Sequence, residues 1–330
     1  MSIRLGLIGV GRWGKRYIQT LRDIKDARLT HLCTRHPENA GLVGHPVEVT
    51  NDWRAMCRAP GLDGVIIATP PSTHPEILHA CFDAKLPALV EKPLCLSLDE
   101  ARKLQQYAKE SGSLVLVDHT HVFHPAFEAI RKQFQDPRAI HLIHSEGEAY
   151  GPFRTNDASV LWDWAPHDVA LCLELLGKMP VSVVCLGTAT RESRPLDSGL
   201  LVLKLEFEND TVAWINIGHL STQKRRRFSI FADERVVVFD DQAQDKLVEH
   251  SNSWHQRFEA AHGGLNEGRA IPFAPGLPLT RVVTEFVQGI SGHPSARFGV
   301  KLAVDVIRVI DAAQVSLQES SRRVDLSQPS

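Results

Sequence analysis

The stretch LIGVGRWG occupies residues 7–14 of this 330-residue chain and decides how its first part folds. Gly9, Gly11 and Gly14 have the G-x-G-x-x-G spacing, directly after the apolar run Ile3–Ile8 and directly before a helix-like segment. The first glycine permits a tight turn, the second lets the backbone approach a pyrophosphate, and the third lets the helix pack closely on the strand. The pattern therefore predicts a strand–turn–helix unit whose helix N-terminus binds the phosphates of a dinucleotide.

Short apolar runs alternate with amphipathic segments over the first 118 residues. A capping box, Ser97-x-x-Glu100, marks the start of one helix, and Gly112 marks its end. The alternation predicts parallel βαβ units in a doubly wound α/β sheet of the Rossmann type. The expected strands are residues 3–8, 29–33, 64–68, 88–91 and 114–118, and the first helix is expected at residues 15–24.

The pattern changes after residue 120, which divides the chain into a dinucleotide-binding domain (1–120) and a second α+β domain (121–330). Apolar and polar residues alternate strictly from residue 201, and Asn209-Asp210 turns the chain into a further strand, as in an open, largely antiparallel sheet. Residues 241–279 are expected to form a long loop over the site or a poorly ordered segment. Residues 299–318 have helical apolar spacing and are expected to pack back towards the first domain.

The composition is that of an ordinary globular protein, with 43% hydrophobic and 23% charged residues. A formal net charge of -2 gives no electrostatic reason to expect nucleic acid or an anionic membrane as a partner. The six cysteines are scattered and none forms a C-x-x-C pair, which is typical of reduced thiols in a cytoplasmic protein. We expect no signal peptide and no membrane span.

Histidines 119, 121 and 124 cluster after the last strand of the first domain. They lack a carboxylate or cysteine at ligand spacing, so we expect loop histidines near the cleft and no metal site.

The cofactor is predicted to be NADP in preference to NAD. An NAD site usually has Asp or Glu at the end of the second strand, where this chain has Thr34-Arg35. A guanidinium can pair with a phosphate dianion that a carboxylate would repel. The alternative is that Arg35 only points into solvent.

Two further loops follow strands that end at the same edge of the sheet, where ligands bind in open α/β folds. One begins Thr69-Pro70 and reaches His74, and the other contains Glu91-Lys92-Pro93. Lys92 could donate a hydrogen bond to a reacting oxygen, although a surface lysine is the simpler reading of this residue alone. The expected cofactor contacts are Gly9, Gly11, Arg12, Trp13, Gly14, Thr34, Arg35, Thr69, Pro70, His74, Glu91 and Lys92.

A second candidate group lies in WDWAPHD, residues 162–168. If Asp163 is an N-cap, His167 follows it by one helical turn, and if Pro166 is instead the first helical residue the two need not share a face. A neutral histidine is a natural proton shuttle near pH 7. The alternative is core packing of two indoles beside a capping aspartate.

These motifs together resemble the Gfo/Idh/MocA family of NAD(P)-dependent oxidoreductases, in the family's order and over nearly the whole chain. The resemblance implies that Lys92, Asp163 and His167 line the substrate site at the nicotinamide. A hydride would pass between the nicotinamide and one carbon of a sugar, cyclitol or nucleotide sugar, while His167 or Lys92 transfers the hydroxyl proton. A homodimer or homotetramer through the open sheet is expected. A noncatalytic cofactor-sensing regulator and a glycosidase that oxidises its substrate transiently remain as alternatives.

The chain departs from the family pattern at one position. Many members carry a second Asp three residues after the His, where this chain has Ala170, and Asp168 follows His167 directly. This departure bears on the substrate contacts. Arg154-x-x-Asp157 and the basic run at residues 224–227 are weaker candidates for polar or phosphate contacts, for example to a nucleotide sugar.

Overall fold

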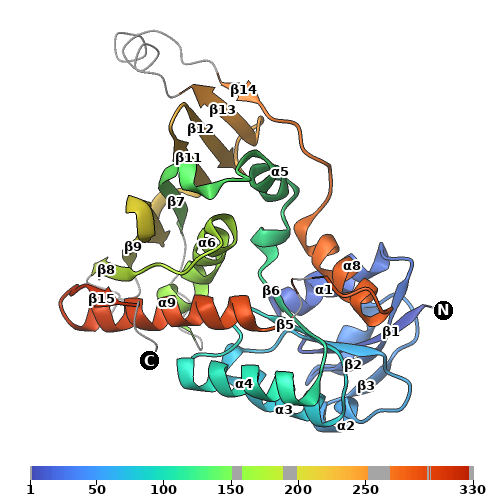
Figure 1. Cartoon of the computed structure of the whole chain (residues 1–330). Coiled ribbons are helices and arrows are strands. Elements are labelled where there is room, and N and C mark those ends of the chain that lie inside the picture. Colours follow the sequence, from blue (N-terminus) through green and yellow to red (C-terminus); the bar gives the residue numbers. More distant parts are fainter. Residues whose placement is uncertain are drawn as a thin grey trace. The chain divides into compact units, whose positions relative to one another are not determined.

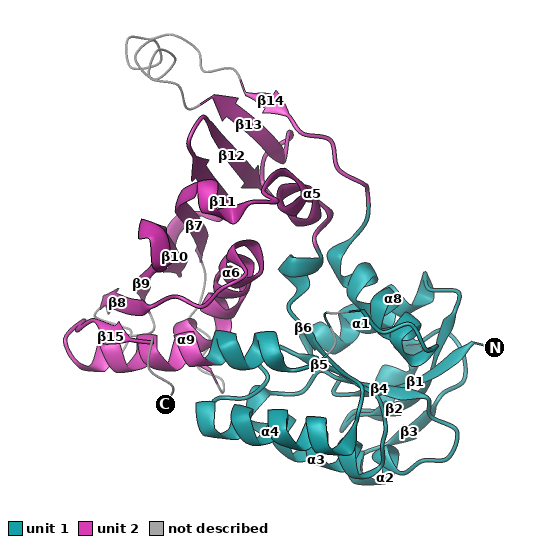
Figure 2. Ribbon diagram, viewed as in Figure 1, with its two compact units in different colours: residues 1–123, 276–307 teal, residues 124–275, 308–330 magenta. Residues whose placement is uncertain are grey.

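The computed structural model describes residues 2–150, 158–188, 199–251, 268–295, 297 and 299–326. The chain divides into two compact units (Figure 2). Unit 1 comprises Met1–Phe123 and Gly276–Ile307, and unit 2 comprises His124–Pro275 and Arg308–Ser330. Each unit has its own sheet and its own apolar core.

Unit 1 is built on a six-stranded parallel sheet of order β3-β2-β1-β4-β5-β6 (Figure 1). All residues of β4, β5 and β6 are buried, as expected for parallel strands covered on both faces. The predicted Rossmann sheet is confirmed, with one short edge strand, β3, that the sequence did not reveal. The strands are β1 (Ile3–Ile8), β2 (Ala27–Cys33), β3 (Glu48–Thr50), β4 (Gly64–Ile67), β5 (Ala88–Glu91) and β6 (Val115–Asp118).

Helices cover both faces of this sheet, with α1 against α8 in one layer and α3 against α4 in the other (Figure 1). The predicted capping box is confirmed, because the Ser97 hydroxyl accepts a hydrogen bond from the Glu100 N–H at 3.5 Å, and Gly112 ends the helix with φ 64°. Helix α8 was not predicted. The helices are α1 (Arg12–Arg22), η1 (Pro37–Leu42), α2 (Trp53–Cys57), η2 (Pro71–Thr73), α3 (His74–Asp83), α4 (Leu98–Ser111), η3 (Thr120–Phe123) and α8 (Pro278–Ile290).

Unit 2 contains a nine-stranded sheet of order β14-β13-β12-β11-β7-β10-β9-β8-β15. Neighbouring strands are antiparallel except β7 and β10, so the predicted largely antiparallel sheet is confirmed. The strands are β7 (Ile140–Tyr150), β8 (Ser182–Thr188), β9 (Leu200–Glu206), β10 (Val212–Gly218), β11 (Leu220–Ala232), β12 (Arg235–Asp240), β13 (Leu247–Ser251), β14 (Arg269–Ala270) and β15 (Val324–Asp325).

The prediction of a continuous loop at residues 241–279 is wrong in part. Strand β13 pairs with β12 within this segment, and β14 pairs with β13. Residues 252–267 lie outside the described part of the chain.

One face of the second sheet is covered by helix α6 (Val160–Leu176), which packs on β7 and β10. Helix α5 (Pro125–Gln133) contacts β12, and α9 (Lys301–Gln318) begins in unit 1 and ends in unit 2. The other face carries large apolar side chains that are exposed, such as Leu186 and Trp214. Short 3₁₀ turns lie at η4 (Pro137–Ala139) and η6 (Glu208–Asp210). Among the described residues, no helix combines the length and the apolar character that crossing a membrane requires.

Candidate functional site

The three glycines of the first turn have different structural roles. Gly9 has φ 94°, and a Cβ there would lie 2.8 Å from the Ala68 carbonyl oxygen. A Cβ on Gly14 would lie 2.1 Å from the Gly9 carbonyl oxygen, so helix α1 can approach β1 only because this residue is glycine. Gly11 faces open space, since nothing lies within 4 Å of a Cβ built there.

The N-terminus of α1 is open to a ligand. Gly11 caps it without a side-chain hydrogen bond, so the first-turn N–H groups have no side-chain acceptor at that position. Arg12 is exposed, and Trp13 is half-buried beneath the Arg16 guanidinium, 5.2 Å from the ring centroid. A helix N-terminus with this exposure favours binding of an anion such as a pyrophosphate.

The glycine turn lies at the topological switch point of the sheet. β1 pairs with β2 on one side and with β4 on the other, and the strand order reverses there. The loops after β1, β2, β4 and β5 therefore all leave the same carboxyl edge, where open α/β sheets bind ligands. The structure thus brings the predicted cofactor residues of unit 1 to one edge.

The loop after β2 assigns different environments to Thr34 and Arg35. The Thr34 hydroxyl accepts hydrogen bonds from the His36 N–H at 3.1 Å and the Asn39 amide at 3.2 Å, and the residue is buried. Its hydroxyl therefore shapes the loop. Arg35 is exposed, and within the described part of the chain no carboxylate lies at ion-pair distance from it.

Buried His74 contacts both the loop after β4 and the loop after β5. Its two ring nitrogens lie 3.0 Å from the Thr69 and the Pro93 carbonyl oxygens, and Pro93 follows a cis peptide bond with Lys92. The Thr73 hydroxyl adds a 2.7 Å hydrogen bond to the Thr69 hydroxyl. The His74 side chain thus holds both loops in place at the carboxyl edge.

A buried acidic cluster lies behind Lys92, which is itself only 8% exposed. Glu91 and Asp118 are partners in the β5–β6 register, and the Tyr17 hydroxyl donates a hydrogen bond to Asp118. Burial raises the pKa of Glu91 well above its usual range, and the neighbouring Asp118 raises it further. Burial also raises the pKa of Asp118, against hydrogen bonds from Tyr17 and Thr120. Tyr17 and Asp118 were not predicted from the sequence, although an acid at the end of the buried strand β6 was a usable signal.

The three histidines expected in loops near the cleft lie in different environments. His119 is buried, and burial together with the Lys92 charge lowers its pKa to about 4. His124 instead caps α5, accepting a hydrogen bond from the Ala126 N–H at 3.1 Å. Where the chain is described, no group of three His, Cys, Asp or Glu side chains could hold a metal ion.

Helix α6 positions Asp163 and His167, and both predicted helix starts are wrong. The helix begins at Val160 after Ser159, so Asp163 lies in its first turn and His167 one turn later on the same face. Both residues are half-buried. Pro166 is inside the helix, where it has no N–H to donate. The helix nevertheless continues to Leu176, because its apolar side chains are buried on the sheet.

Asp168 ties this helix to the second sheet. It is buried, accepts a 2.6 Å hydrogen bond from the Ser145 hydroxyl on β7, and lies 3.6 Å from an Arg226 nitrogen on β11. A Cβ at Gly147 would lie 3.1 Å from the Asp168 carboxylate and 3.2 Å from that nitrogen. Arg226 also lies over the Trp164 ring at 5.8 Å. Asp168 thus fixes the rotation of the helix that carries His167.

Two of the four cations in the basic run at residues 224–227 have acidic partners. Arg225 lies 3.0 Å from Glu146 and 3.9 Å from Glu148, both on β7, and Arg226 faces Asp168. These pairs make it a weaker anion site than the sequence suggested. The other weak candidate, Arg154-x-x-Asp157, lies outside the described residues.

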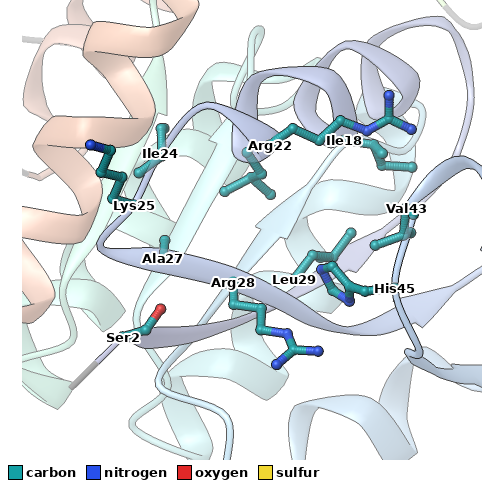
Figure 3. Close-up of a pocket in the computed structure, with 12 residues that line it drawn as sticks. Ser2, Ile18, Arg22, Ile24, Lys25, Ala27, Arg28, Leu29, Val43 and His45 are labelled. Carbon is teal, nitrogen blue, oxygen red and sulfur yellow. The ribbon is translucent and has the colours of Figure 1, made fainter.

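A groove of about 640 Å³ lies at the amino-terminal ends of β1 and β2, away from the carboxyl edge. It contains Arg22, Lys25, Arg28 and His45 above an apolar floor. Figure 3 shows the Arg22 and Lys25 charges pointing to opposite sides and the Arg28 charge pointing a third way. Binding sites for small molecules have converging polar groups, so the carboxyl edge is the better candidate.

Two family models match this chain. Residues 3–119 match the oxidoreductase family model with the NAD-binding Rossmann fold, and residues 129–238 match the GFO/IDH/MocA C-terminal domain. Together the two matches span more than half of the chain.

Characterised enzymes are among the relatives. A UDP-N-acetylglucosamine 3-dehydrogenase of Acidithiobacillus ferrooxidans is 30% identical over 306 residues, which span 89% of this chain and 90% of that protein. A scyllo-inositol 2-dehydrogenase (NADP(+)) of Bacillus subtilis is 25% identical, spanning 96% of this chain and 94% of that protein.

Solved structures share the fold. A protein of Magnetospirillum magnetotacticum, described as an oxidoreductase, is 35% identical with a TM-score of 0.85, and the match covers 94% of this chain and 99% of that one. A levoglucosan dehydrogenase, solved with NADH and levoglucosan, has a TM-score of 0.84 at 20% identity, with 99% of this chain and 100% of that chain covered. At this identity the second likeness shows the fold alone.

Proposed function

The chain belongs to the Gfo/Idh/MocA family of NAD(P)-dependent oxidoreductases, and from this premise we propose that it interconverts a hydroxyl and a carbonyl group on a sugar, cyclitol or nucleotide sugar. The observation that carries the proposal is the glycine turn at the sheet's switch point, in a chain whose two parts both match the family models. Relatives named for UDP-N-acetylglucosamine and for inositol support this substrate class.

The proposed cofactor preference is for NADP. Arg35 is exposed after β2, at the position where an acidic residue would bind the ribose of NAD. Relatives include both an NADP(+) enzyme and an NAD(+) enzyme, so the proposed preference rests on Arg35 and its loop and not on family membership. A bidentate guanidinium–phosphate pair contributes about 1.5–3 kcal/mol, which corresponds to roughly 10–100-fold in affinity.

Replacing Arg35 tests the preference directly. We expect Arg35→Ala to weaken NADPH binding by roughly 10–100-fold and to leave NADH binding nearly unchanged, as measured by fluorescence titration. Arg28→Ala, an exposed arginine at the other end of the same strand, is the matched control. Equal losses for both cofactors, or wild-type affinity for both, would refute the role of Arg35.

The proposed catalytic residues are Lys92, Asp163 and His167. The nicotinamide supplies or accepts the hydride when it is bound. Lys92, as an ammonium, stabilises the developing alkoxide and donates to the reacting oxygen. His167 accepts or returns the hydroxyl proton, and Asp163, one turn earlier on α6, orients His167 or the substrate. Asp163 and His167 are only half-buried, so part of each side chain remains accessible to a ligand.

Substitution tests these roles. Lys92→Met and His167→Gln should each lower kcat by at least about 100-fold, within the range of general acid–base catalysis, and leave cofactor affinity largely intact. Lys103→Met and His141→Gln, both at exposed positions, serve as matched controls. Near-normal turnover in either catalytic variant would refute its assigned role.

A substrate screen separates the proposal from its alternatives. Sugars, cyclitols and UDP-sugars are tested with each cofactor, and formation of reduced nicotinamide is followed by absorbance. Net reduction of the cofactor supports a dehydrogenase. Glycoside cleavage without net reduction would indicate transient oxidation, and cofactor binding without turnover on any member of the panel would indicate a sensor.

The open face of the second sheet is the proposed surface for homodimers or homotetramers. Trp214 and Leu186 on this face are 37% and 46% exposed, which is unusual for such large apolar side chains. Trp214→Lys should therefore reduce the molar mass measured by light scattering. A reducing compartment such as the cytoplasm is part of the proposal, since all six cysteines carry free, buried thiols.

A further inference from the structure

Two buried carboxyl groups and a buried phenol lie directly behind Lys92. Asp118 is fully buried, Glu91 is 5% exposed and Tyr17 is fully buried. These three residues come from β6, β5 and α1, and the carboxyl groups belong to register partners on adjacent strands. Such a group of side chains is costly to bury, so it requires an explanation beyond packing.

The hydrogen bonds distinguish the two acids. The Tyr17 hydroxyl donates to Asp118, whereas the buried Oε1 atom of Glu91 has no hydrogen-bond partner among the described residues. A buried carboxylate oxygen without a donor is costly when ionised, so Glu91 is the acid that holds the proton. Asp118 receives a second hydrogen bond, at 2.7 Å, from the Thr120 hydroxyl, which favours its ionised form.

The electrostatics agree with one proton and one negative charge on the two acids. Two adjacent carboxylates in a dry environment do not both ionise readily, so the pair loses one proton easily and resists losing the second. The buried side chain that follows Glu91, Lys92, interacts electrostatically with both acids. His119, which also interacts electrostatically with Lys92, is neutral near pH 7 because burial lowers its pKa to about 4.

We propose that Glu91 and Asp118, with Tyr17 bound to Asp118, form a relay that holds one proton and one negative charge behind Lys92, and that the three residues act as positioning residues for Lys92. The single charge balances the Lys92 ammonium and holds it at the carboxyl edge. A second negative charge would be too costly to bury, and loss of all negative charge from the two acids would leave the Lys92 ammonium without a counter-charge. This role rests on the proposed function, in which Lys92 acts on the reacting oxygen.

The shared charge makes the two acids interchangeable. In Asp118→Asn, Glu91 loses its charged neighbour and takes over the negative charge, and in Glu91→Gln, Asp118 keeps it. Each single variant should therefore lower kcat by less than about 10-fold, whereas the double variant, which has no charge, should lower it by more than about 100-fold, as expected for strongly coupled groups. Additive effects would overturn the proposal.

An exposed tyrosine–aspartate pair provides a matched control in the same unit. The Tyr107 hydroxyl donates to Asp83 at the surface. Tyr107→Phe and Asp83→Asn should leave turnover unchanged. Tyr17→Phe, in contrast, removes a hydrogen-bond donor to Asp118 and should lower kcat.

Infrared difference spectra between the free wild-type enzyme and each free variant give a readout that does not depend on turnover. The wild type should show the carbonyl stretch of one protonated carboxyl group at pH 7, and this band should disappear in both Glu91→Gln and Asp118→Asn. Loss in Asp118→Asn is the decisive result, because packing alone would leave Glu91 protonated. A missing band in the wild type, or one that persists in Asp118→Asn, overturns the inference.

The two measurements separate the inference from the function on which it rests. If the band behaves as expected and no substrate is reduced or oxidised, the carboxyl relay stands and the proposed function fails. If turnover is found and the band is absent, the function stands and the relay fails. If the double variant does not fold, the spectra of the two single variants still test whether the acids share one proton.

Discussion

Two alanine substitutions in the glycine turn should separate folding from cofactor binding. At Gly14, a Cβ would lie 2.1 Å from the Gly9 carbonyl oxygen, whereas Cβ contacts below 3.0 Å are essentially never seen, so α1 must move away from β1 by about 1 Å. Overpacking of this kind costs about 1–3 kcal/mol. For a unit of this size, that corresponds to a fall in Tm of roughly 2–12 °C.

Gly11→Ala should behave differently in the free protein. Gly11 has φ -75° and ψ -157°, which any residue adopts, and nothing lies within 4 Å of the new methyl group. The change at the N-cap costs at most about 1 kcal/mol. In the complex, the methyl group would stand where the pyrophosphate approaches, and losing one charge-assisted hydrogen bond weakens binding by roughly 10–100-fold.

Thermal unfolding and fluorescence titration with NADPH and NADH measure the two effects. We expect Gly14→Ala to lower Tm and cofactor affinity together, and Gly11→Ala to lower affinity for both cofactors with Tm nearly unchanged. Wild-type affinity in Gly11→Ala would refute the assignment of this backbone to the pyrophosphate. An unchanged Tm in Gly14→Ala would show that α1 tolerates the displacement.

Three further predictions concern stability. The pKa of His119 is near 4 in the folded chain and about 6.5 when unfolded, so the free energy of unfolding should fall by up to about 3 kcal/mol as the pH drops between these values. Urea titrations at several pH values should show this loss in the wild type and a flatter dependence in His119→Leu, whereas parallel curves would contradict it. Ser145→Ala removes the donor to buried Asp168 and should cost about 1–3 kcal/mol by urea unfolding, and a change within error would mean that the carboxylate finds another donor. Ser97→Ala should cost only about 0.5–1 kcal/mol, because its capping hydrogen bond is long at 3.5 Å, and a larger loss would indicate a further role.

The fold of unit 1 was largely predictable because its strands are continuous apolar runs separated by amphipathic segments. Strand β3 escaped detection because it has three residues at a sheet edge, none of them buried. Strand β13 lies in a polar segment, so its antiparallel pairing with the preceding strand β12 was not evident from the apolar pattern. Helix α8 (Pro278–Ile290) begins at the end of the segment 241–279, and no element was predicted there.

Only those residues of the site that belong to a local sequence motif were predictable. The glycine turn and Lys92 lie in recognisable local patterns, but the start of α6 was not readable, because Pro166 usually marks a first helical turn and here sits inside the helix. The relay behind Lys92 joins Tyr17 to Asp118, which are 101 positions apart in the chain. Contacts of that kind arise from strand order and helix packing, and a pattern along one sequence does not contain them.

Unit 1 is discontinuous, and this affects how the chain matures on the ribosome. Its sheet is complete within residues 1–123, but α8 (Pro278–Ile290) belongs to the same unit and lies in its second segment, residues 276–307. A Cβ at Gly64 on β4 would lie 2.7 Å from Ile290 and 3.1 Å from Phe286, so α8 covers that strand closely. At about 5–20 residues per second, translation leaves the part of the sheet that α8 covers exposed for roughly 10–40 s. The part of the protein that is synthesised first is therefore among the last to be finished, and during that interval the nascent chain is a target for chaperones.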